Sequence, residues 1–304
     1  MFKMFKKKKS RVKKSPSLSI LAAILILCLA IISGGATIFF DSSSEIAQDL
    51  VVKVLDVGQG DAALIRTPQK VVLIDTGDIS MRDSLMAHLA REKISSLDKV
   101  IITHPHADHL GGMPRLLETI EVKQIYDSGY VHSTNLYRQY LTSVSNKKVP
   151  FKLVSDGDLI DLGNDISLKI LSPPKTLISG TNSDINNNSI VAKLIYGEFS
   201  MLFTGDIERE SEARLVKNHG KELKSTVLKS PHHGSRSSST IPFLRETDPK
   251  VVVISLGVNN RYNHPHQSVL KRYSDRGIKI YRTDTDGTVT ITSDGKFYKI
   301  SKEK

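Results

Sequence analysis

The sequence predicts one α/β domain over residues 50–304. Short runs of β-branched and aliphatic residues recur between glycine- and proline-containing breaks, as in strands joined by tight turns. Amphipathic stretches with apolar residues at helical spacing lie among these runs. No internal repeat and no Pro-rich or Ser-rich break interrupts the chain after residue 50. A hydrophobic content of 39% is ordinary for a globular core, so a single domain of about 250 residues is the simplest interpretation.

The first half of the domain is predicted to open with three successive strands and to continue with helices and strands in turn. The helix at residues 80–93 places Met81, Leu85 and Leu89 on one face and ends in basic residues. A second helix is predicted at 112–120. The expected strands are 51–58, 62–67, 70–77, 99–104 and 121–129.

The second half of the domain is also predicted to contain both helices and strands. A helix is expected at 208–220, where Gly220 occupies the C-cap position, and another at 266–277. Residues 281–300 contain two Asp-Gly pairs, each of which predicts a hairpin turn. The expected strands are 151–158, 166–173, 189–197, 199–206 and 250–257.

The positive charge is concentrated at the N-terminus. The formal net charge is +11, from 43 basic and 32 acidic residues. Residues 1–14 contain seven Lys, one Arg and no acidic residue, so the remainder carries 35 basic and 32 acidic groups, a net of +3. The body of the chain is therefore nearly balanced, and its overall charge is no nucleic-acid footprint.

An uncharged apolar segment, residues 18–40, follows this basic tail. As a helix it would span about 35 Å, enough for a bilayer core. We expect residues 1–17 to be a basic cytoplasmic tail, 18–40 a transmembrane anchor and 41–49 a polar linker. Because positive flanks stay in the cytoplasm, the domain that follows would be extracytoplasmic, on a single-pass protein of the cell membrane.

A cleaved signal peptide is the alternative for this segment. Gly34 and Ala36 offer a small-residue cleavage pattern, and the domain would then be secreted, but the apolar run exceeds the length usual for signal peptides. Cys28, the single cysteine, follows Leu25, Ile26 and Leu27 and lacks the small residues of a lipoprotein site. The domain therefore contains no disulfide.

The densest cluster of metal-ligand residue types is THPHADH, which contains His104, His106, Asp108 and His109. The chance of such a pattern in a chain of this length is on the order of 10⁻³. Two histidines at i and i+2 of a strand are often just solvated neighbours on one face. The same geometry lets His104 and His106 bind one cation, while Asp108 and His109 reach a second. Imidazole and carboxylate ligands favour zinc, with manganese or iron as alternatives.

One loop is too short to complete two metal sites. Asp206 in FTGD and His232 and His233 in PHHGS follow other apolar runs, where ligands from distant parts of an α/β chain can meet. Alone, Asp206 could equally be a helix-capping residue. Together with THPHADH, these residues supply enough nitrogen and carboxylate ligands for a two-metal centre.

The motifs LDVGQGDA, LIDTG, THPHADHLGG, FTGD and PHHGS, in this order, resemble the metallo-β-lactamase fold superfamily, and specifically the branch typified by the hydrolase domain of the competence protein ComEC. The resemblance implies a four-layer αββα sandwich with two divalent metal ions at one edge of its sheets. It implies that His104 and His106 bind the first metal, and that Asp108 and His109 bind the second together with one of His232 and His233, of which His233 is the favoured ligand. Asp206 would bridge both metals, and with His233 as the ligand His232 would contact substrate.

The resemblance also suggests supporting residues. Asp75 would orient a ligand histidine, as metal-bound imidazoles generally require. Asp56 and Asp61 would line the same edge, although both could simply be turn-forming residues. His264 is a candidate for protonating the leaving group, or a plain loop histidine, and Asp108 for handling a proton. Candidate substrate contacts are Asn186, Asn187, Ser189 and Ser235.

The chain departs from the wider superfamily between THPHADH and Asp206. Many members have a further ligand histidine there, whereas His132 is the only histidine in residues 110–205. The segment NNNSIV, residues 186–191, stands where that ligand is expected. The first metal would then be held by fewer protein ligands.

The leading hypothesis is an enzyme, a metallo-hydrolase that uses a metal-activated water to cleave a phosphodiester, with DNA the substrate that the family suggests. Lys229, Arg236 and Arg261 flank the proposed site and could pair with phosphate. Other enzymatic candidates are a phosphorylcholine esterase, a lactonase and a β-lactamase. A non-catalytic, membrane-tethered binding module is the alternative of another class. The membrane and a nucleic-acid or related phosphodiester substrate are the partners inferred, and no protein partner is inferred.

Overall fold

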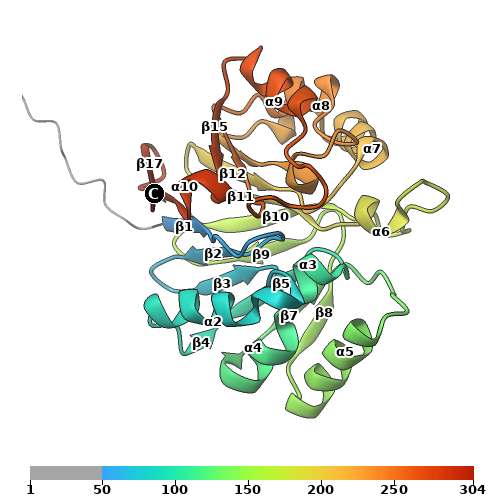
Figure 1. Cartoon of the computed structure of the whole chain (residues 1–304), viewed down its shortest axis with the longest axis vertical. Coiled ribbons are helices and arrows are strands. Elements are labelled where there is room, and N and C mark those ends of the chain that lie inside the picture. Colours follow the sequence, from blue (N-terminus) through green and yellow to red (C-terminus); the bar gives the residue numbers. More distant parts are fainter. Residues whose placement is uncertain (1–49) are drawn as a thin grey trace, which may run out of the picture. The chain divides into compact units, whose positions relative to one another are not determined.

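The computed structural model describes residues 50–304, which form two β-sheets with helices on their outer faces (Figure 1). The basic tail, the apolar segment at residues 18–40 and the polar linker lie outside the described residues. Within residues 50–304, no helix has both the length and the apolar character that crossing a bilayer requires.

The first sheet has eight strands in the order β17-β16-β1-β2-β3-β5-β7-β8. Strands from β17 to β3 pair antiparallel and those from β3 to β8 pair parallel. The last two strands of the chain therefore lie beside the first. The strands are β1 (Leu50–Val54), β2 (Ala63–Arg66), β3 (Val71–Ile74), β5 (Lys99–Ile102), β7 (Ile125–Asp127), β8 (Phe151–Leu153), β16 (Val289–Ser293) and β17 (Tyr298–Lys302).

The second sheet has seven strands in the order β15-β14-β13-β12-β11-β10-β9. Strands β9 to β12 pair antiparallel, and β12 to β15 pair parallel. They are β9 (Leu159–Asp161), β10 (Ser167–Ser172), β11 (Val191–Tyr196), β12 (Phe199–Phe203), β13 (Val227–Lys229), β14 (Val251–Ile254) and β15 (Lys279–Arg282). A small separate pair joins β4 (Ser96–Leu97) to β6 (Glu121–Val122).

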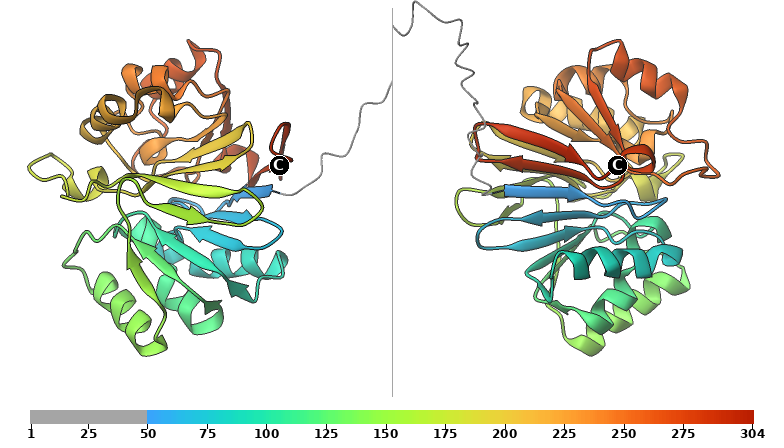
Figure 2. Two further views of the ribbon diagram at one scale, coloured as in Figure 1. Left: turned by 180° about the vertical axis from the view of Figure 1, so that it is seen from behind. Right: turned by 60° about the vertical axis from the view of Figure 1, so that its left-hand side comes forward.

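Helices cover the outer face of each sheet (Figures 1 and 2). Those on the first sheet are α2 (Arg82–Arg91), α4 (Met113–Thr119) and α5 (Asn135–Lys147). Those on the second sheet are α7 (Arg209–His219), α8 (Ile241–Thr247) and α9 (Gln267–Ser274). The shorter helices are α3 (Ala107–Leu110), α6 (Asp184–Asn187), α10 (Thr283–Asp286), η1 (Ile79–Met81), η2 (Gly220–Leu223) and η3 (Pro231–Gly234).

Three apolar clusters fill the interfaces between these four layers. One contains buried residues from both sheets, one joins the first sheet to its helices, and one joins the second sheet to its helices. In β3, Val72 and Ile74 face the other sheet, whereas Leu73 faces the helices. This alternation follows from the two-residue period of a strand, and it requires both faces to be apolar. The predicted αββα sandwich is therefore confirmed.

Most elements predicted from the sequence are present, with strands that end one to five residues earlier than expected. Gly220 follows α7 as its C-cap, with φ of 46°. Asp294 and Gly295 do turn the chain between the antiparallel strands β16 and β17. Helices α5 and α8 were not predicted.

The hairpin predicted at Asp286 and Gly287 is wrong. Strand β15, which precedes it, pairs with β14 in the second sheet, while β16 belongs to the first sheet. The segment between them is the short helix α10, in which Oδ2 of Asp286 accepts a hydrogen bond from the Arg282 N–H at 2.9 Å. Here the Asp-Gly pair lies at the end of the connection that passes from the second sheet to the first.

The fold brings several strand ends together at one edge of the sandwich. Parallel strands β12, β13 and β14 of the second sheet end at the same edge, because they run in one direction. The segments after β5, β12 and β13 carry the candidate metal ligands. Segments far apart in the sequence therefore supply one site, as is usual at the carboxyl ends of strands in α/β proteins.

Candidate metal centre

The loop after β5 places two imidazoles next to each other. His104 is fully buried, and its Nε2 lies 3.0 Å from Nδ1 of His106. His106 is the N-cap of α3, so the chain turns into a helix directly after it. The turn separates the pair His104 and His106 from the pair Asp108 and His109.

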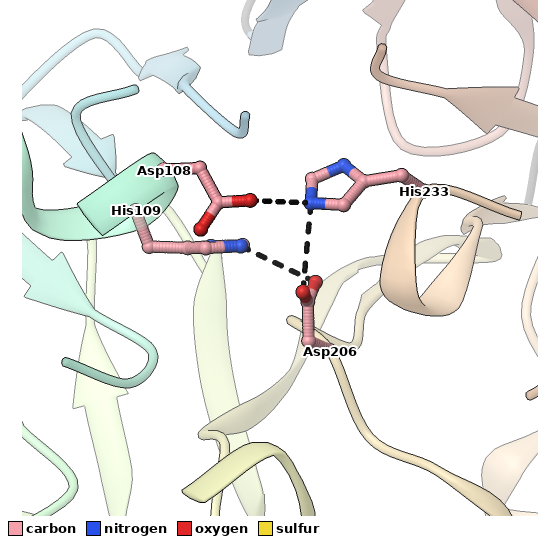
Figure 3. A group of neighbouring side chains, drawn as sticks. All are labelled: Asp108, His109, Asp206 and His233. Carbon is pink, nitrogen blue, oxygen red and sulfur yellow. Dashed lines mark ion pairs between the residues drawn. The ribbon is translucent and has the colours of Figure 1, made fainter. Parts of the chain in front are cut away.

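A second group of four candidate ligands comes from three segments: Asp108 and His109 in α3, Asp206 after β12 and His233 in η3 (Figure 3). One ligand atom from each lies within 4.8 Å of the others. His109 Nε2 lies 3.3 Å from Asp206 Oδ1. His233 Nε2 lies 3.5 Å from both Asp108 Oδ2 and Asp206 Oδ2. Figure 3 shows the four side chains pointing toward a common region.

Asp206 lies near both the pair His104 and His106 and the other members of its own group. Its Oδ2 is 4.0 Å from Nε2 of His104, and its Oδ1 faces His109. The carboxylate is 2% exposed, so it has little access to water. This position suits a carboxylate shared by two cations.

The residues present fit a metal centre. Among the described residues, the few buried side-chain atoms without a hydrogen-bond partner include His109 Nε2, His233 Nε2 and Asp206 Oδ1, all directed at this region. A buried polar atom without a partner costs free energy, so three together fit a site that binds a cation. Imidazole nitrogens with carboxylate oxygens are the donor set of zinc, and manganese and iron accept it as well.

In two of these imidazoles, Nδ1 lies within hydrogen-bond distance of an acceptor oxygen. His109 Nδ1 lies 2.8 Å from Asp75 Oδ2, and that carboxylate also accepts the Thr103 N–H at 2.8 Å and its hydroxyl at 2.7 Å. His233 Nδ1 lies 2.9 Å from the carbonyl of Ser255. Each contact favours the tautomer with the proton on Nδ1, which leaves Nε2 free to bind a cation.

The buried carboxylates of the cluster favour positive charge on the groups around them. Burial alone would raise the pKa of Asp206, but the His233 and His109 imidazoles lower it well below its usual range. Burial lowers the pKa of His109, yet the carboxylates of Asp206 and Asp75 raise it well above its usual range. The buried carboxylates thus draw protons onto the imidazoles, at the place where cations would supply the charge instead.

A buried ion pair lies beside the centre. Lys229 Nζ is 2.8 Å from Asp61 Oδ2, and Asp61 Oδ1 is 3.4 Å from His233 Nδ1. Lys229 is 3% exposed, so its expected role as a phosphate contact is wrong. The physical reason is that the buried Asp61 carboxylate pairs with the Lys229 ammonium group, which is therefore not available to a phosphate. Burial tends to raise the pKa of Asp61, but Lys229 and His233 lower it below its usual range.

The centre lies in an open cleft of about 640 Å³. The cleft contains residues of both groups together with a loop between β14 and α9. Its lining residues are Gln59, Asp78, Ser80, Met81, His106, Ala107, Asp108, Asn186, Asp206, His232, His233, Asn260, Arg261, Tyr262 and His264. A ligand in the cleft would therefore reach the metal-ligand candidates directly.

His232 and Asn186 lie in this cleft and share one acidic partner. Glu208 Oε1 lies 3.3 Å from His232 Nδ1 and accepts the Asn186 amide at 3.1 Å. His232 Nε2 is 3.7 Å from Asp206 Oδ2. His232 is therefore next to the centre without joining the group of four, and His233 is the histidine of that pair that joins it.

His264 and His132 lie on the margins of the centre. His264 lines the cleft, and its Nδ1 is buried without a hydrogen-bond partner. Burial and the neighbouring His233 lower the pKa of His264 to about 3. The ring of His132 is 6.0 Å from that of His106 but does not line the cleft.

Four other residues expected at the site do not line the cleft, because other groups hold them. Asp56 pairs with Lys304, with 3.0 Å between Oδ2 and Nζ. Asn187 bonds to Thr181, Glu208, Glu210 and Ser211. Ser189 accepts the Asp206 N–H at 3.2 Å, and Ser235 lies 2.9 Å from Ser237. The structure thus places Asp56, Asn187 and Ser235 outside the cleft, where their expected roles stay predictions, and Ser189 accepts the hydrogen bond that positions the Asp206 backbone.

Several cleft residues do not stand out as site candidates in the sequence: Gln59, Asp78, Ser80, Met81, Ala107, Asn260 and Tyr262. Gln59 lies inside the Gly-rich turn of LDVGQGDA, and Tyr262 lies two positions before His264. Both are found from the sequence when every residue of LDVGQGDA and every near neighbour of His264 is treated as a candidate.

Comparison with known proteins agrees with this geometry. Residues 55–258 match the family model described as "Metallo-beta-lactamase superfamily". The chain is 34% identical to ComE operon protein 3 of Bacillus subtilis over 257 residues, which are 78% of this chain and 32% of that protein. It is 30% identical to Competence protein ComA of Neisseria gonorrhoeae over 242 residues, 79% of this chain and 32% of that protein. The chain thus spans about a third of the length of these relatives.

A solved structure with a similar fold is the metallo-beta-lactamase fold protein YhfI from Bacillus subtilis. The TM-score is 0.53 at 14% sequence identity, and the match covers 80% of this chain and all of that one. At this identity the likeness shows a shared fold.

Proposed function

We propose that this chain, which belongs to the metallo-β-lactamase superfamily, is a membrane-anchored, metal-dependent hydrolase of phosphodiester bonds. The observation that carries the proposal is the meeting of Asp108, His109, Asp206 and His233 in an open cleft beside the pair His104 and His106. A group that served only to stabilise the fold would be closed, as structural metal sites are.

The candidate ligands divide between two cations. His104 and His106 would hold the first, and Asp108, His109 and His233 the second, with Asp206 shared. When bound, such cations supply a water of lowered pKa and stabilise negative charge on the reacting oxygens.

The remaining cleft residues suggest further roles. Asp108 is 23% exposed at its side chain and lines the cleft, so its carboxylate can accept a proton from a water held there. His264 Nδ1 has no partner and can hydrogen-bond to a leaving-group oxygen. His232 is held by Glu208 and directs its Nε2 toward Asp206, where it can contact an oxygen of the substrate.

Two observations favour a phosphodiester substrate. The guanidinium of Arg261 lies at the cleft and suits a phosphate oxygen, unlike the enclosed Lys229. One relative is named "Competence protein ComA", and DNA is the substrate that the resemblance to the ComEC branch suggests. DNA or a related polymer is therefore the proposed substrate.

A substrate panel tests the reaction. The metal-loaded protein is expected to hydrolyse bis-p-nitrophenyl phosphate and single-stranded DNA, and not nitrocefin. Asp108→Ala should lower the rate about 100-fold or more, because it removes both a ligand and a proton acceptor. His219→Gln, on α7 and outside the cleft, is the matched control and should keep full activity. Nitrocefin hydrolysis alone would make the enzyme a β-lactamase. Absence of all hydrolysis would favour a binding module.

The membrane anchor is proposed from residues 18–40, with the domain outside the cell. Protease added to intact cells should then digest the domain and leave the tail protected. Protection of the domain until the cells are lysed would reject this topology, and recovery of the free domain from the medium would indicate a cleaved signal peptide.

A further inference from the structure

Three rings lead outward from the metal centre along one wall of the cleft. The rings of His233 and His264 are 6.4 Å apart with an interplanar angle of 24°. The rings of His264 and Tyr262 are 5.5 Å apart at 23°. Tyr262 is 42% exposed and lines the cleft, so the series starts at a buried metal-ligand candidate and ends at a ring in contact with solvent.

The loop that carries Tyr262 is held in shape by one side chain. Asn260 donates its amide to the carbonyls of Gly257 at 3.1 Å and His264 at 2.7 Å, and it accepts the His264 N–H at 3.0 Å. Asn259 and Asn263 adopt left-handed φ values of 53° and 55°, which asparagine tolerates better than most residues. The loop therefore presents Tyr262 without needing a ligand to order it.

The cationic side chain of Arg261 lies next to the Tyr262 ring. The guanidinium of Arg261 lies 4.9 Å from the centre of the Tyr262 ring, and its Nη2 donates to the phenol oxygen at 2.7 Å. Arg261 is exposed and also lines the cleft. An anionic group beside the ring would meet a cation already in place.

The cleft also offers an apolar contact and a free donor. Met81, from η1, lines the cleft with Tyr262. Gln59 Nε2 is a buried amide nitrogen without a hydrogen-bond partner. The cleft thus combines a partly exposed aromatic ring, a thioether, a cation and an unused N–H, which matches a flat heteroaromatic group attached to an anion.

We propose that Tyr262 is a stacking platform for a nucleobase of an unpaired strand, with Arg261 binding the phosphate beside that base. This inference rests on the proposed phosphodiesterase function and names its substrate more closely. Base stacking on aromatic side chains is the usual way in which proteins hold single strands, and every base has a face that can stack. A base within a duplex has both faces covered by its neighbours, so the platform selects unpaired ends or single strands.

The absence of tryptophan from the chain provides a direct probe. Tyr262→Trp introduces one tryptophan, whose fluorescence a stacked base should quench. Tyr298→Trp, at an exposed tyrosine on β17 outside the cleft, is the matched control. Each full-length variant is titrated with oligothymidylate, with an abasic backbone of equal length and charge, and with a duplex.

Quenching of the Tyr262→Trp signal by oligothymidylate, and little by the abasic backbone, the duplex or in the control, would support the proposal. Affinity for oligothymidylate should fall about 10-fold in Tyr262→Ala, which corresponds to roughly 1.4 kcal/mol, and should be kept in Tyr262→Phe. Equal quenching by the abasic backbone, equal quenching by the duplex, or unchanged affinity in Tyr262→Ala would overturn it.

The outcome for the reaction is read separately. If wild-type protein hydrolyses oligothymidylate and the abasic backbone equally well, and Tyr262→Ala does not change either rate, the stacking site is rejected and the phosphodiesterase function stands. If base-dependent quenching occurs without hydrolysis of any phosphodiester, the phosphodiesterase function is rejected and the stacking site stands.

Discussion

At the scale of single residues, the candidate ligands depend on groups that do not face the cleft. Asp75 accepts hydrogen bonds from Thr103 and lies 2.8 Å from Nδ1 of His109, so it sets the orientation and tautomer of that ring. Asp75 is 1% exposed, so its surroundings restrict the position of the carboxylate.

We predict that Asp75→Asn lowers metal affinity about 10- to 100-fold, because the amide holds the imidazole less firmly and no longer supplies charge behind it. Competition with a chromogenic chelator measures the affinity, and circular dichroism checks that the fold is kept. An affinity equal to that of the wild type in a folded variant would show that His109 needs no such support.

Asp127, at the end of β7, makes stability depend on pH. Its carboxyl accepts the Gly129 N–H at 2.8 Å and the Tyr140 hydroxyl at 3.2 Å. Burial raises its pKa from 3.8 to about 6, against the lowering effect of these bonds. Between these values the folded protein keeps a proton that the unfolded chain releases, so stability falls as pH rises through this window.

We predict that the free energy of unfolding of the wild type falls by about 1 to 2 kcal/mol between pH 5 and pH 8, relative to Asp127→Asn. The amide does not ionise, so its variant lacks this loss. Urea unfolding at both pH values measures the difference. A constant gap between the two proteins would mean that Asp127 titrates alike when folded and unfolded.

At the scale of elements, the Gly-rich turn between β1 and β2 fits directly onto the loop of metal ligands. The Asp61 N–H donates to the carbonyl of Asp108 at 3.1 Å. Gly60 has φ of 129°, and a Cβ there would lie 2.3 Å from the same carbonyl oxygen. The turn and the ligand loop therefore form one structural unit.

We predict that Gly60→Ala lowers the free energy of unfolding by about 2 to 4 kcal/mol and weakens metal binding, because the methyl group displaces the Asp108 backbone. Gly157→Ala is the matched control, since Gly157 has φ of 99° and open space around it. It should cost about 1 kcal/mol and leave metal binding unchanged. Similar metal affinities in both variants would contradict this role of the turn.

Whether residues come from one element or from distant elements explains which features could be predicted from the sequence. His104, His106, Asp108 and His109 lie in one short motif, so their meeting was predictable from local geometry. The role of Lys229 was not, because its partner Asp61 comes from a distant turn that only the tertiary fold brings near. The Asp286 hairpin failed for a related reason, since a turn signal does not say which sheet the next strand joins.

At the scale of the whole molecule, the centre joins the two halves of the sandwich. His104 to His109 come from the first sheet, whereas Asp206 and His233 come from segments that follow strands of the second. Cations bound here would stabilise only the assembled domain, because the ligands are far apart in the unfolded chain.

We predict that a metal concentration of about 100 times the dissociation constant stabilises the domain by about 2.7 kcal/mol per site, which raises Tm by roughly 5 to 10 °C. Thermal unfolding with and without a chelator measures this shift. Asp206→Asn should show little response to the chelator. A wild-type Tm that is the same under both conditions would show that metal binding does not couple the halves.

The pairing of β1 with β16 also determines when the domain can be completed during its synthesis. The ribosome releases β1 early, but the strand that covers one of its edges is among the last to emerge. At ~5–20 residues per second, that edge stays open for roughly 10 to 50 s. Throughout this interval the nascent chain exposes unpaired backbone groups and an apolar strand face, which makes it a client for chaperones and a site for association with other nascent chains.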